Sequence, residues 1–195
     1  MNFTEKIFTL LSENLKLPYY QAERRIDIFI NVFLEDIVRK YSPFKDAIYL
    51  LSEFPLKKTE VSDHAAHIDY LMFSPSKQTV LLVELKTDER SVNVNQLKFY
   101  ESEPRFCEWY TKFEKIKMKG FDSKKNIVKK LLKERLGDDL TQYSCALIII
   151  KPDGPTESDK KEGRYFIALN EVDIDTEYAD EWRLFREIIL SNLSK

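Results

Sequence analysis

The stretch His67–Tyr100, HIDYLMFSPSKQTVLLVELKTDERSVNVNQLKFY, decides the fold of this chain. It contains two apolar runs, separated by the turn sequence Ser74-Pro75-Ser76-Lys77. Apolar runs of this length that are bounded by turn residues are typical of buried strands, here predicted at 67–74 and 79–87. A polar loop then leads into a helix predicted at about 93–103.

Three charged residues lie inside these apolar strands: Asp69 in the first, Glu84 and Lys86 in the second. A charge in such a strand is costly unless it is paired or binds a metal. If the two strands pair as a hairpin, Asp69 lies beside Glu84. Two carboxylates at that spacing suit a hard cation such as Mg2+, and the metal can activate a water against a phosphodiester. Alternating side chains place Lys86 on the face of Glu84, where it can hold the water or stabilise the charged phosphorus.

The bulk composition fits one soluble domain, residues 1–195, with a sizeable core. The chain has 43% hydrophobic and 33% charged residues, four glycines and two cysteines. So few glycines and cysteines argue against a Gly-rich phosphate loop, a disulfide framework and an iron–sulfur cluster. The N-terminus does not resemble a signal peptide, and no apolar run is long enough to span a membrane. We therefore expect a cytoplasmic protein that does not associate with membranes.

The remaining periodicities predict helices before and after the hairpin and two further strands. Ser42-Pro43 ends the second helix, and Asp153-Gly154-Pro155 ends the fourth strand. Strands with helices on both sides predict an α/β fold of three layers around a mixed central sheet. The other expected elements are helices at 7–15, 18–41, 104–118, 123–136 and 179–193, and strands at 47–57, 143–151 and 164–169.

Four short motifs follow one another along the chain in the order of a known family. They are Glu53-Phe54-Pro55-Leu56, Ile68-Asp69, Glu84-x-Lys86-Thr87 and Gln96-x-x-x-Tyr100. In this order and context the chain resembles the PD-(D/E)XK nuclease superfamily, in particular its RecB-like branch. The E-x-K and Q-x-x-x-Y patterns each occur once, and the first lies in an apolar strand.

The resemblance implies a restriction-endonuclease-like core over about residues 25–150, followed by a C-terminal strand and helix within 151–195. It also implies Mg2+- or Mn2+-dependent cleavage of DNA, and pairing of two copies is possible because many such nucleases are dimers. Metal would be held by Asp69, Glu84 and the backbone carbonyl of Leu85. Lys86 would act in catalysis, and Gln96 and Tyr100 would orient the site.

Two features depart from the family pattern. No proline precedes Asp69, which follows His67-Ile68. The glutamate that the family carries on an early helix has no unique match: Glu35 is our choice, with Glu23 as the second candidate. Glu53 offers a further carboxylate that can replace it structurally.

Charge is distributed unevenly, although the net charge is only −2. Residues 112–135 hold ten Lys and Arg against three acids, and residues 153–187 hold eleven acids against five bases. The basic segment, with Trp109, Tyr110 and Phe113 nearby, predicts phosphate contacts and base stacking; the alternative is core aromatics beneath a solvated face. The lysines expected to contact DNA are Lys98, Lys124, Lys125, Lys129 and Lys130.

Three hypotheses follow for the chain as a whole. The first is a metal-dependent DNA nuclease. The second is a catalytically silent module on the same fold that binds nucleic acid or protein, with no need for metal. The third is a non-nuclease globular protein with a coincidental motif, which would show no Mg2+ site and would place Asp69 and Glu84 far apart. For Asp69, Glu84 and Lys86 themselves, the alternative to a catalytic site is a structural salt-bridge network in a strand that reaches the sheet edge.

Overall fold

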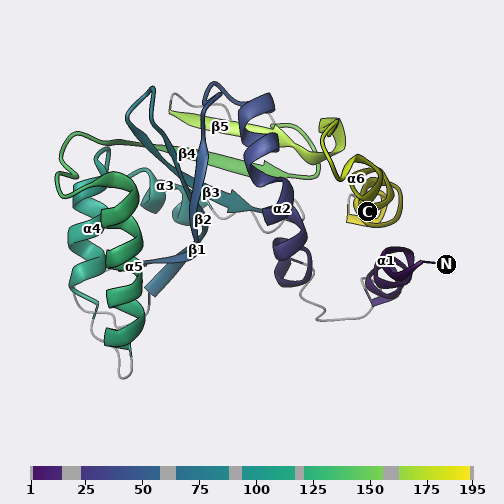
Figure 1. Ribbon diagram of the computed structural model, residues 1–195, viewed down its shortest axis with the longest axis horizontal. Coiled ribbons are helices and arrows are strands. Elements are labelled where there is room, and N and C mark those ends of the chain that lie inside the picture. The colour runs from purple at the N-terminus through teal and green to yellow at the C-terminus, as the bar shows by residue number, and fades with distance from the viewer. Residues whose placement is uncertain are drawn as a thin grey trace. The chain divides into compact units, whose positions relative to one another are not determined.

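Five strands form one mixed sheet in the order β1-β2-β3-β4-β5 (Figure 1). The computed structural model describes residues 2–14, 23–57, 65–87, 94–116, 121–155 and 163–193. The strands are β1 (Ile48–Lys57), β2 (Ala65–Ser74), β3 (Thr79–Leu85), β4 (Ser144–Lys151) and β5 (Arg164–Ala168). The helices are α1 (Phe3–Asn14), α2 (Glu23–Tyr41), α3 (Val94–Tyr100), α4 (Phe106–Glu114), α5 (Phe121–Leu136), α6 (Ala179–Phe185) and α7 (Ser191–Leu193), with a 3-10 turn η3 (Leu169–Glu171) and a π turn η4 (Arg186–Leu190).

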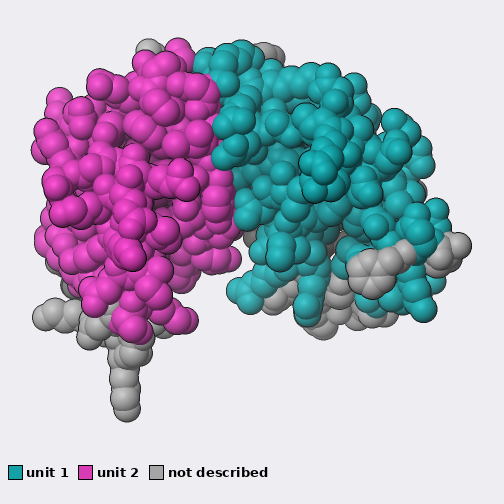
Figure 2. Space-filling view, in the orientation of Figure 1, with its two compact units in different colours: residues 1–45, 85–92, 149–195 teal, residues 46–84, 93–148 magenta. Residues whose placement is uncertain are grey.

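The chain divides into two compact units, coloured separately in Figure 2. Unit 1 comprises residues 1–45, 85–92 and 149–195, and unit 2 comprises residues 46–84 and 93–148. The boundary passes through β3 after Glu84 and through β4 after Ile148. Glu84 therefore belongs to unit 2, whereas Leu85 and Lys86 belong to unit 1.

Unit 2 is built on the antiparallel strands β1, β2 and β3. Pro55 lies in β1, the edge strand, where the lack of an N–H does not interrupt the sheet. Helices α4 and α5 pack on β1, and the ring of Phe54 meets those of Phe106 and Phe113 at 6.0 and 5.2 Å. The core of this unit is therefore an aromatic layer between the sheet and two helices that lie side by side (Figure 1).

Unit 1 buries an aromatic cluster between its first two helices and its C-terminal helical segment. Phe29 of α2 stacks on Phe185 at 4.5 Å, and Phe33 contacts Trp182 at 5.1 Å. Phe8 of α1 completes the cluster at 5.0 Å from Phe29. The C-terminal segment runs from α6 through the π turn η4 to α7, so the helix predicted at 179–193 is confirmed with one local change of winding.

The expected α/β class with a mixed sheet is confirmed, and the structure is consistent with three layers. All five predicted strands are present, with ends that differ by a few residues. Parts of the predicted helices at 18–41, 93–103 and 104–118 lie outside the described residues. The expectations of a single domain and of a restriction-endonuclease-like core stay predictions.

Two helices leave large apolar side chains in solvent. In α2, Ile28 and Val32 are 75% and 59% exposed because the helix buries its Ile26, Ile30 and Phe33 side. In α5, Ile127 and Leu131 are exposed. The helix is turned so that Lys125 and Lys129 face α4 instead, and their ammonium groups bind Glu114 there.

Candidate active site

Asp69 and Glu84 come directly after the last pair at the far end of the β2–β3 hairpin. The strands pair from Ser74–Thr79 to Tyr70–Val83, and continuing this register by one residue would set Asp69 opposite Glu84. Residues directly opposite in an antiparallel pair share a face and lie about 5 Å apart at Cβ. The predicted hairpin is confirmed; the pairing of Asp69 with Glu84 extends its register by one residue and stays a prediction.

Two polar side chains of α3 reach these strands from successive helical turns. Gln96 Nε2 donates to Glu84 Oε1 at 2.8 Å and to the Tyr100 hydroxyl at 2.7 Å. The Tyr100 hydroxyl donates onward to the backbone carbonyl of His67 at 3.0 Å, two residues before Asp69. Gln96 and Tyr100 thus tie one helical face to both acidic strands, and they orient the buried carboxylate of Glu84, which is 2% exposed.

Electrostatics place both carboxylates near the same hydroxyl. Burial is the main factor that raises the pKa of Tyr100 far above its ordinary value, and the negative charges of Glu84 and Asp69 raise it further. The hydrogen bond from Gln96 works in the opposite direction. Tyr100 therefore stays a neutral donor at all physiological pH values.

The Tyr100→Phe variant tests this environment through the pH dependence of stability. A tyrosine whose pKa is raised in the folded state contributes stability that is fully present below pH 10 and is lost as the pH rises. We expect the free-energy difference between wild type and Y100F, measured by urea unfolding, to be equal at pH 7 and pH 9. Above pH 10 it should shrink by about 1.4 kcal/mol per pH unit. A difference that stays constant up to pH 11 would contradict a buried Tyr100 beside two carboxylates.

Lys86 and Leu85 follow Glu84 directly in the chain but belong to unit 1. Lys86 is only 5% exposed, and its backbone N–H donates to the Ile150 carbonyl at 2.8 Å. Side chains two residues apart in a strand point to the same face, and this alternation alone predicts that Lys86 points to the face of Glu84. The roles of the Lys86 ammonium and the Leu85 carbonyl stay predictions.

Glu35, the expected helix glutamate, lies on α2 in unit 1 and is about two-fifths exposed. Its carboxylate pairs with the Arg39 guanidinium at 2.7 Å, one helical turn away. Its predicted part in the site is not tested by this contact. The side chain of the second candidate, Glu23, lies outside what the structure describes.

Glu53 occupies the position of β1 opposite Asp69, because Ser52 pairs with Tyr70 and Phe54 with Ile68. If the β2–β3 register continues by one residue, Glu53, Asp69 and Glu84 would lie in one row across three strands. Glu53 has a left-handed backbone with φ 55°, a conformation that costs a non-glycine residue about 1 kcal/mol or more. This strain lies on the strand next to the candidate site, and the Glu53 side chain is exposed.

The donor set at the hairpin fits a small divalent cation. Among the described residues, no group of three or more His, Cys, Asp and Glu side chains is placed to hold a metal. Mg2+ does not need such a group, because it is commonly bound by one or two carboxylates and keeps several waters. Asp69 and Glu84 supply two carboxylates in register, and Gln96 holds one of them in place. Mn2+ accepts the same oxygen ligands.

The lysines predicted to contact DNA divide into two groups. Lys98, Lys124 and Lys130 are exposed, Lys130 in a loose 3.8 Å pair with Glu134. The other two tie α5 to α4: Lys125 Nζ donates to the backbone carbonyls of Glu114 and Ile116, and Lys129 Nζ binds the Glu114 carboxylate at 2.6 Å. Part of the basic segment thus has a structural use, and DNA contact by any of the five stays a prediction.

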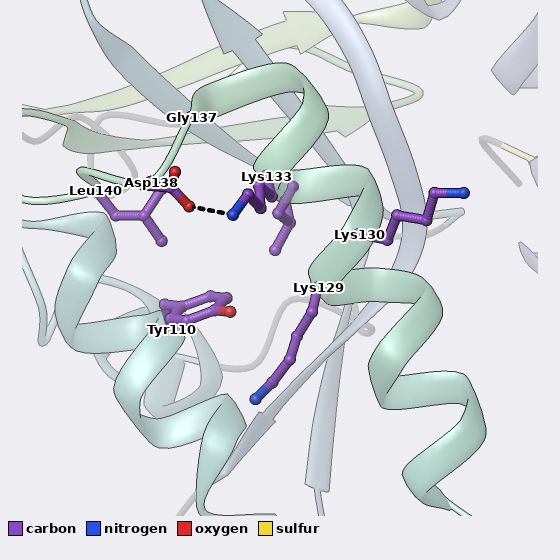
Figure 3. A pocket seen from close by; sticks show the side chains of 8 residues that line it. Tyr110, Lys129, Lys130, Lys133, Gly137, Asp138 and Leu140 are labelled. Atoms are coloured by element: carbon purple, nitrogen blue, oxygen red, sulfur yellow. Dashed lines mark ion pairs between the residues drawn. The ribbon is translucent and has the colours of Figure 1, made fainter.

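A cavity of about 360 Å3 opens between α4 and α5 (Figure 3). The ring of Tyr110 and the stems of Lys129 and Lys133 line it, and the side chain of Lys130 points away from Tyr110. An ion pair of 2.8 Å joins Lys133 to Asp138 at the rim. Since acids accompany all three of its lysines, the cavity is less positive than a count of the basic residues indicates.

The aromatic residues beside the basic segment form core rather than a stacking platform. Trp109 and Phe113 are fully buried, and Trp109 packs edge-on against Phe99 of α3 at 5.0 Å. The structure thus supports the alternative of core aromatics for these two residues, because α4 turns them toward the sheet and α3. Only Tyr110, half-buried at the cavity, keeps a partly open ring.

Lys151 is a buried charged residue that the sequence reasoning missed. It ends the apolar strand β4, SCALIIIK, and is 1% exposed. The signal was present in the sequence. A charge in a buried strand needs an explanation, and this holds for Lys151 as it does for Glu84 and Lys86. It was missed because a lysine at a strand end normally extends into solvent.

Comparison with known proteins adds no family to this geometry. No protein-family model, curated protein or solved structure matches the chain. Within the described part of the chain, no helix combines the length and the apolar character needed to cross a membrane. The functional argument therefore rests on the site itself.

Proposed function

We propose that this protein is a Mg2+-dependent nuclease that hydrolyses DNA phosphodiester bonds. The observation that carries the proposal is the β2–β3 register, which on continuation by one residue would set Asp69 opposite Glu84, together with the 2.8 Å hydrogen bond from Gln96 of α3 to Glu84. Two converging carboxylates fixed by neighbouring groups are what a divalent-cation site requires. The order of Asp69, Glu84, Lys86, Gln96 and Tyr100 along the chain matches the PD-(D/E)XK pattern, which supports the same chemistry.

Each residue has a definite task in this proposal. Asp69 and Glu84 hold the cation, and the Leu85 carbonyl is a further ligand. Gln96 keeps the Glu84 carboxylate in one orientation, and Tyr100 fixes Gln96 against the His67 backbone. Such neighbouring contacts reduce the reorganisation needed before the reaction, which is a large part of catalysis by positioning.

The reaction replaces one phosphorus–oxygen bond with another. A water oxygen bonds to phosphorus as the bond to the leaving 3′ oxygen breaks in line; the water loses a proton and the 3′ oxygen gains one. A bound cation supplies Lewis acidity that lowers the pKa of the attacking water and offsets the charge growing on the phosphoryl oxygens. The ammonium group of Lys86, two residues after Glu84, adds positive charge for the same oxygens.

The test is degradation of DNA by the purified protein. Linear and circular DNA, each single- and double-stranded, is incubated with Mg2+, with Mn2+ or with EDTA, and RNA of matched length is included. We expect cleavage of at least one DNA substrate that requires the divalent cation, and survival of circles would identify an exonuclease. A matched control is Glu171→Gln, an exposed glutamate of η3 in unit 1.

The competing proposal is a silent nucleic-acid-binding module on the same fold. The exposed lysines Lys98, Lys124 and Lys130 favour it, since such groups bind phosphates without any metal. It predicts DNA affinity that is equal in EDTA and in Mg2+ and that survives Glu84→Ala. That result, with no cleavage by the wild type on any substrate, would replace the nuclease proposal.

A further inference from the structure

Two nearly inaccessible lysines lie at the end of the sheet within unit 1. Lys86 and Lys151 are 5% and 1% exposed. Lysine is among the residues least often buried, since removing an ammonium group from water is costly. Two such residues in one small region therefore require an explanation.

The two lysines are neighbours across adjacent strands. The Ser144 N–H donates to Gln78 O at 3.1 Å and the Lys86 N–H donates to Ile150 O at 2.8 Å, so β3 and β4 run parallel in a constant register. In a parallel ladder, a residue that donates to residue 150 lies beside residue 151. Lys86 and Lys151 therefore lie side by side, and neighbours in register point to the same face of the sheet.

The ladder ends at this pair. The residue that would donate back to Lys86 in a parallel ladder is Pro152, which has no N–H. Both lysines thus mark the carboxyl ends of parallel strands, the edge at which open α/β sheets bind their ligands. Lys151 Nζ also lies 5.6 Å from the ring centre of Phe166 on β5, a cation–π contact.

We propose that Lys86 and Lys151 together bind a phosphate group of the substrate, with Lys151 as a second, unassigned phosphate-binding residue. The two ammonium groups are neighbouring hydrogen-bond donors on one face of the sheet, and each has further contacts of its own. An anion with several oxygens, such as a phosphodiester, can accept from both at once. The identity of the anion as nucleic-acid phosphate rests on the proposed nuclease function; the anion site itself rests on the lysine pair.

The first test is stabilisation of the metal-free protein by inorganic phosphate. Each variant's melting temperature is compared in phosphate and in chloride of equal ionic strength, so that its own baseline cancels. We expect phosphate to raise the melting temperature of wild type. The exposed-lysine control Lys77→Met should show the same rise as wild type, and Lys151→Arg should show a smaller one. Lys151→Met keeps the apolar stem but removes the charge, and it should lose the shift. An equal shift in wild type and Lys151→Met would overturn the proposal.

The second test is kinetic. Loss of one charged hydrogen bond to substrate corresponds to about a 10- to 100-fold fall in kcat/KM for Lys151→Met, with recovery in Lys151→Arg. If Lys151→Met does not fold, Lys151→Arg decides: a stable protein that keeps the phosphate shift supports the proposal, and one that has lost it overturns it. Equal loss in both variants with equally lowered melting temperatures would assign Lys151 a purely structural role.

These results separate this inference from the nuclease proposal. Glu84→Gln removes a metal ligand but neither lysine, so it should keep the metal-free phosphate shift. A Lys151-dependent phosphate shift in a protein that cleaves no nucleic acid would leave the anion site standing and sink the nuclease. Metal-dependent cleavage that Lys151→Met does not affect would support the nuclease and overturn the role of Lys151 in binding the substrate phosphate.

Discussion

Replacing Glu84 with glutamine is expected to slow Mg2+-dependent DNA cleavage by at least about a thousandfold. The change removes one negative charge from a two-carboxylate set, and a neutral amide holds a divalent cation poorly. The fold should persist, because the amide oxygen of glutamine can accept the 2.8 Å hydrogen bond from Gln96 Nε2 as Glu84 Oε1 does. The measurement is single-turnover cleavage of the substrate identified for the wild type.

Two comparisons make this result specific to the site. Asp69→Asn changes the carboxylate opposite and should reduce cleavage to a similar degree, whereas Glu171→Gln should leave it unchanged. Mg2+ should raise the melting temperature of wild type and of Glu171→Gln, but of neither site variant. Full activity in Glu84→Gln, in a protein with unchanged circular dichroism, would show that cleavage does not depend on the hairpin carboxylates.

The hairpin end of the site was predictable because its information is local. A turn at Ser74–Lys77 between two apolar runs fixes the pairing, and a period of two then sets Asp69 against Glu84. The Gln-x-x-x-Tyr spacing likewise places Gln96 and Tyr100 on one helical face. The hydrogen bond from Gln96 to Glu84 needed only that α3 follow β3 and pack on the same hairpin.

The misread features depend on packing between elements that are distant in the sequence. Periodicity alone could not show that α2 covers its neighbours with one side only, or that Lys125 and Lys129 turn toward Glu114. A lysine stem can lie against an apolar surface while its ammonium finds a carbonyl or carboxylate, so composition does not tell which face is inner. For the same reason Lys151 was overlooked: its burial depends on the register between β3 and β4.

Trp182→Phe is expected to lower the free energy of unfolding by about 2–4 kcal/mol, whereas Trp109→Phe should change it by about 1 kcal/mol or less. Both side chains are fully buried, so the loss of apolar contact is similar. They differ in their indole N–H groups. Trp182 Nε1 donates to the Val172 carbonyl at 3.0 Å, while Trp109 Nε1 finds no acceptor among the described residues.

The difference follows from the cost of a buried polar group without a partner. Phenylalanine at 182 leaves the Val172 carbonyl without its donor, and phenylalanine at 109 removes an unsatisfied N–H, which offsets the lost packing. Lys112 Nζ lies 4.8 Å from the centre of the Trp109 ring. Phenylalanine makes a weaker cation–π contact than tryptophan, and this lowers the free energy of unfolding of Trp109→Phe by about 0.5–1 kcal/mol. Urea unfolding followed by circular dichroism gives both values, and the single tryptophan left in each variant reports on the other unit.

A larger loss for Trp109→Phe than for Trp182→Phe would contradict this ranking and would mean that the Trp109 N–H has a partner essential to unit 2. The comparison bears on the site as well. Trp109 packs on Phe99, whose neighbours on α3 are Tyr100 and, one turn earlier, Gln96. If Trp109→Phe is nearly neutral for stability, any loss of cleavage in it reports the position of α3 against Glu84. A stable Trp109→Phe protein with reduced cleavage would therefore link the helix-borne glutamine to catalysis without altering any group that touches the substrate.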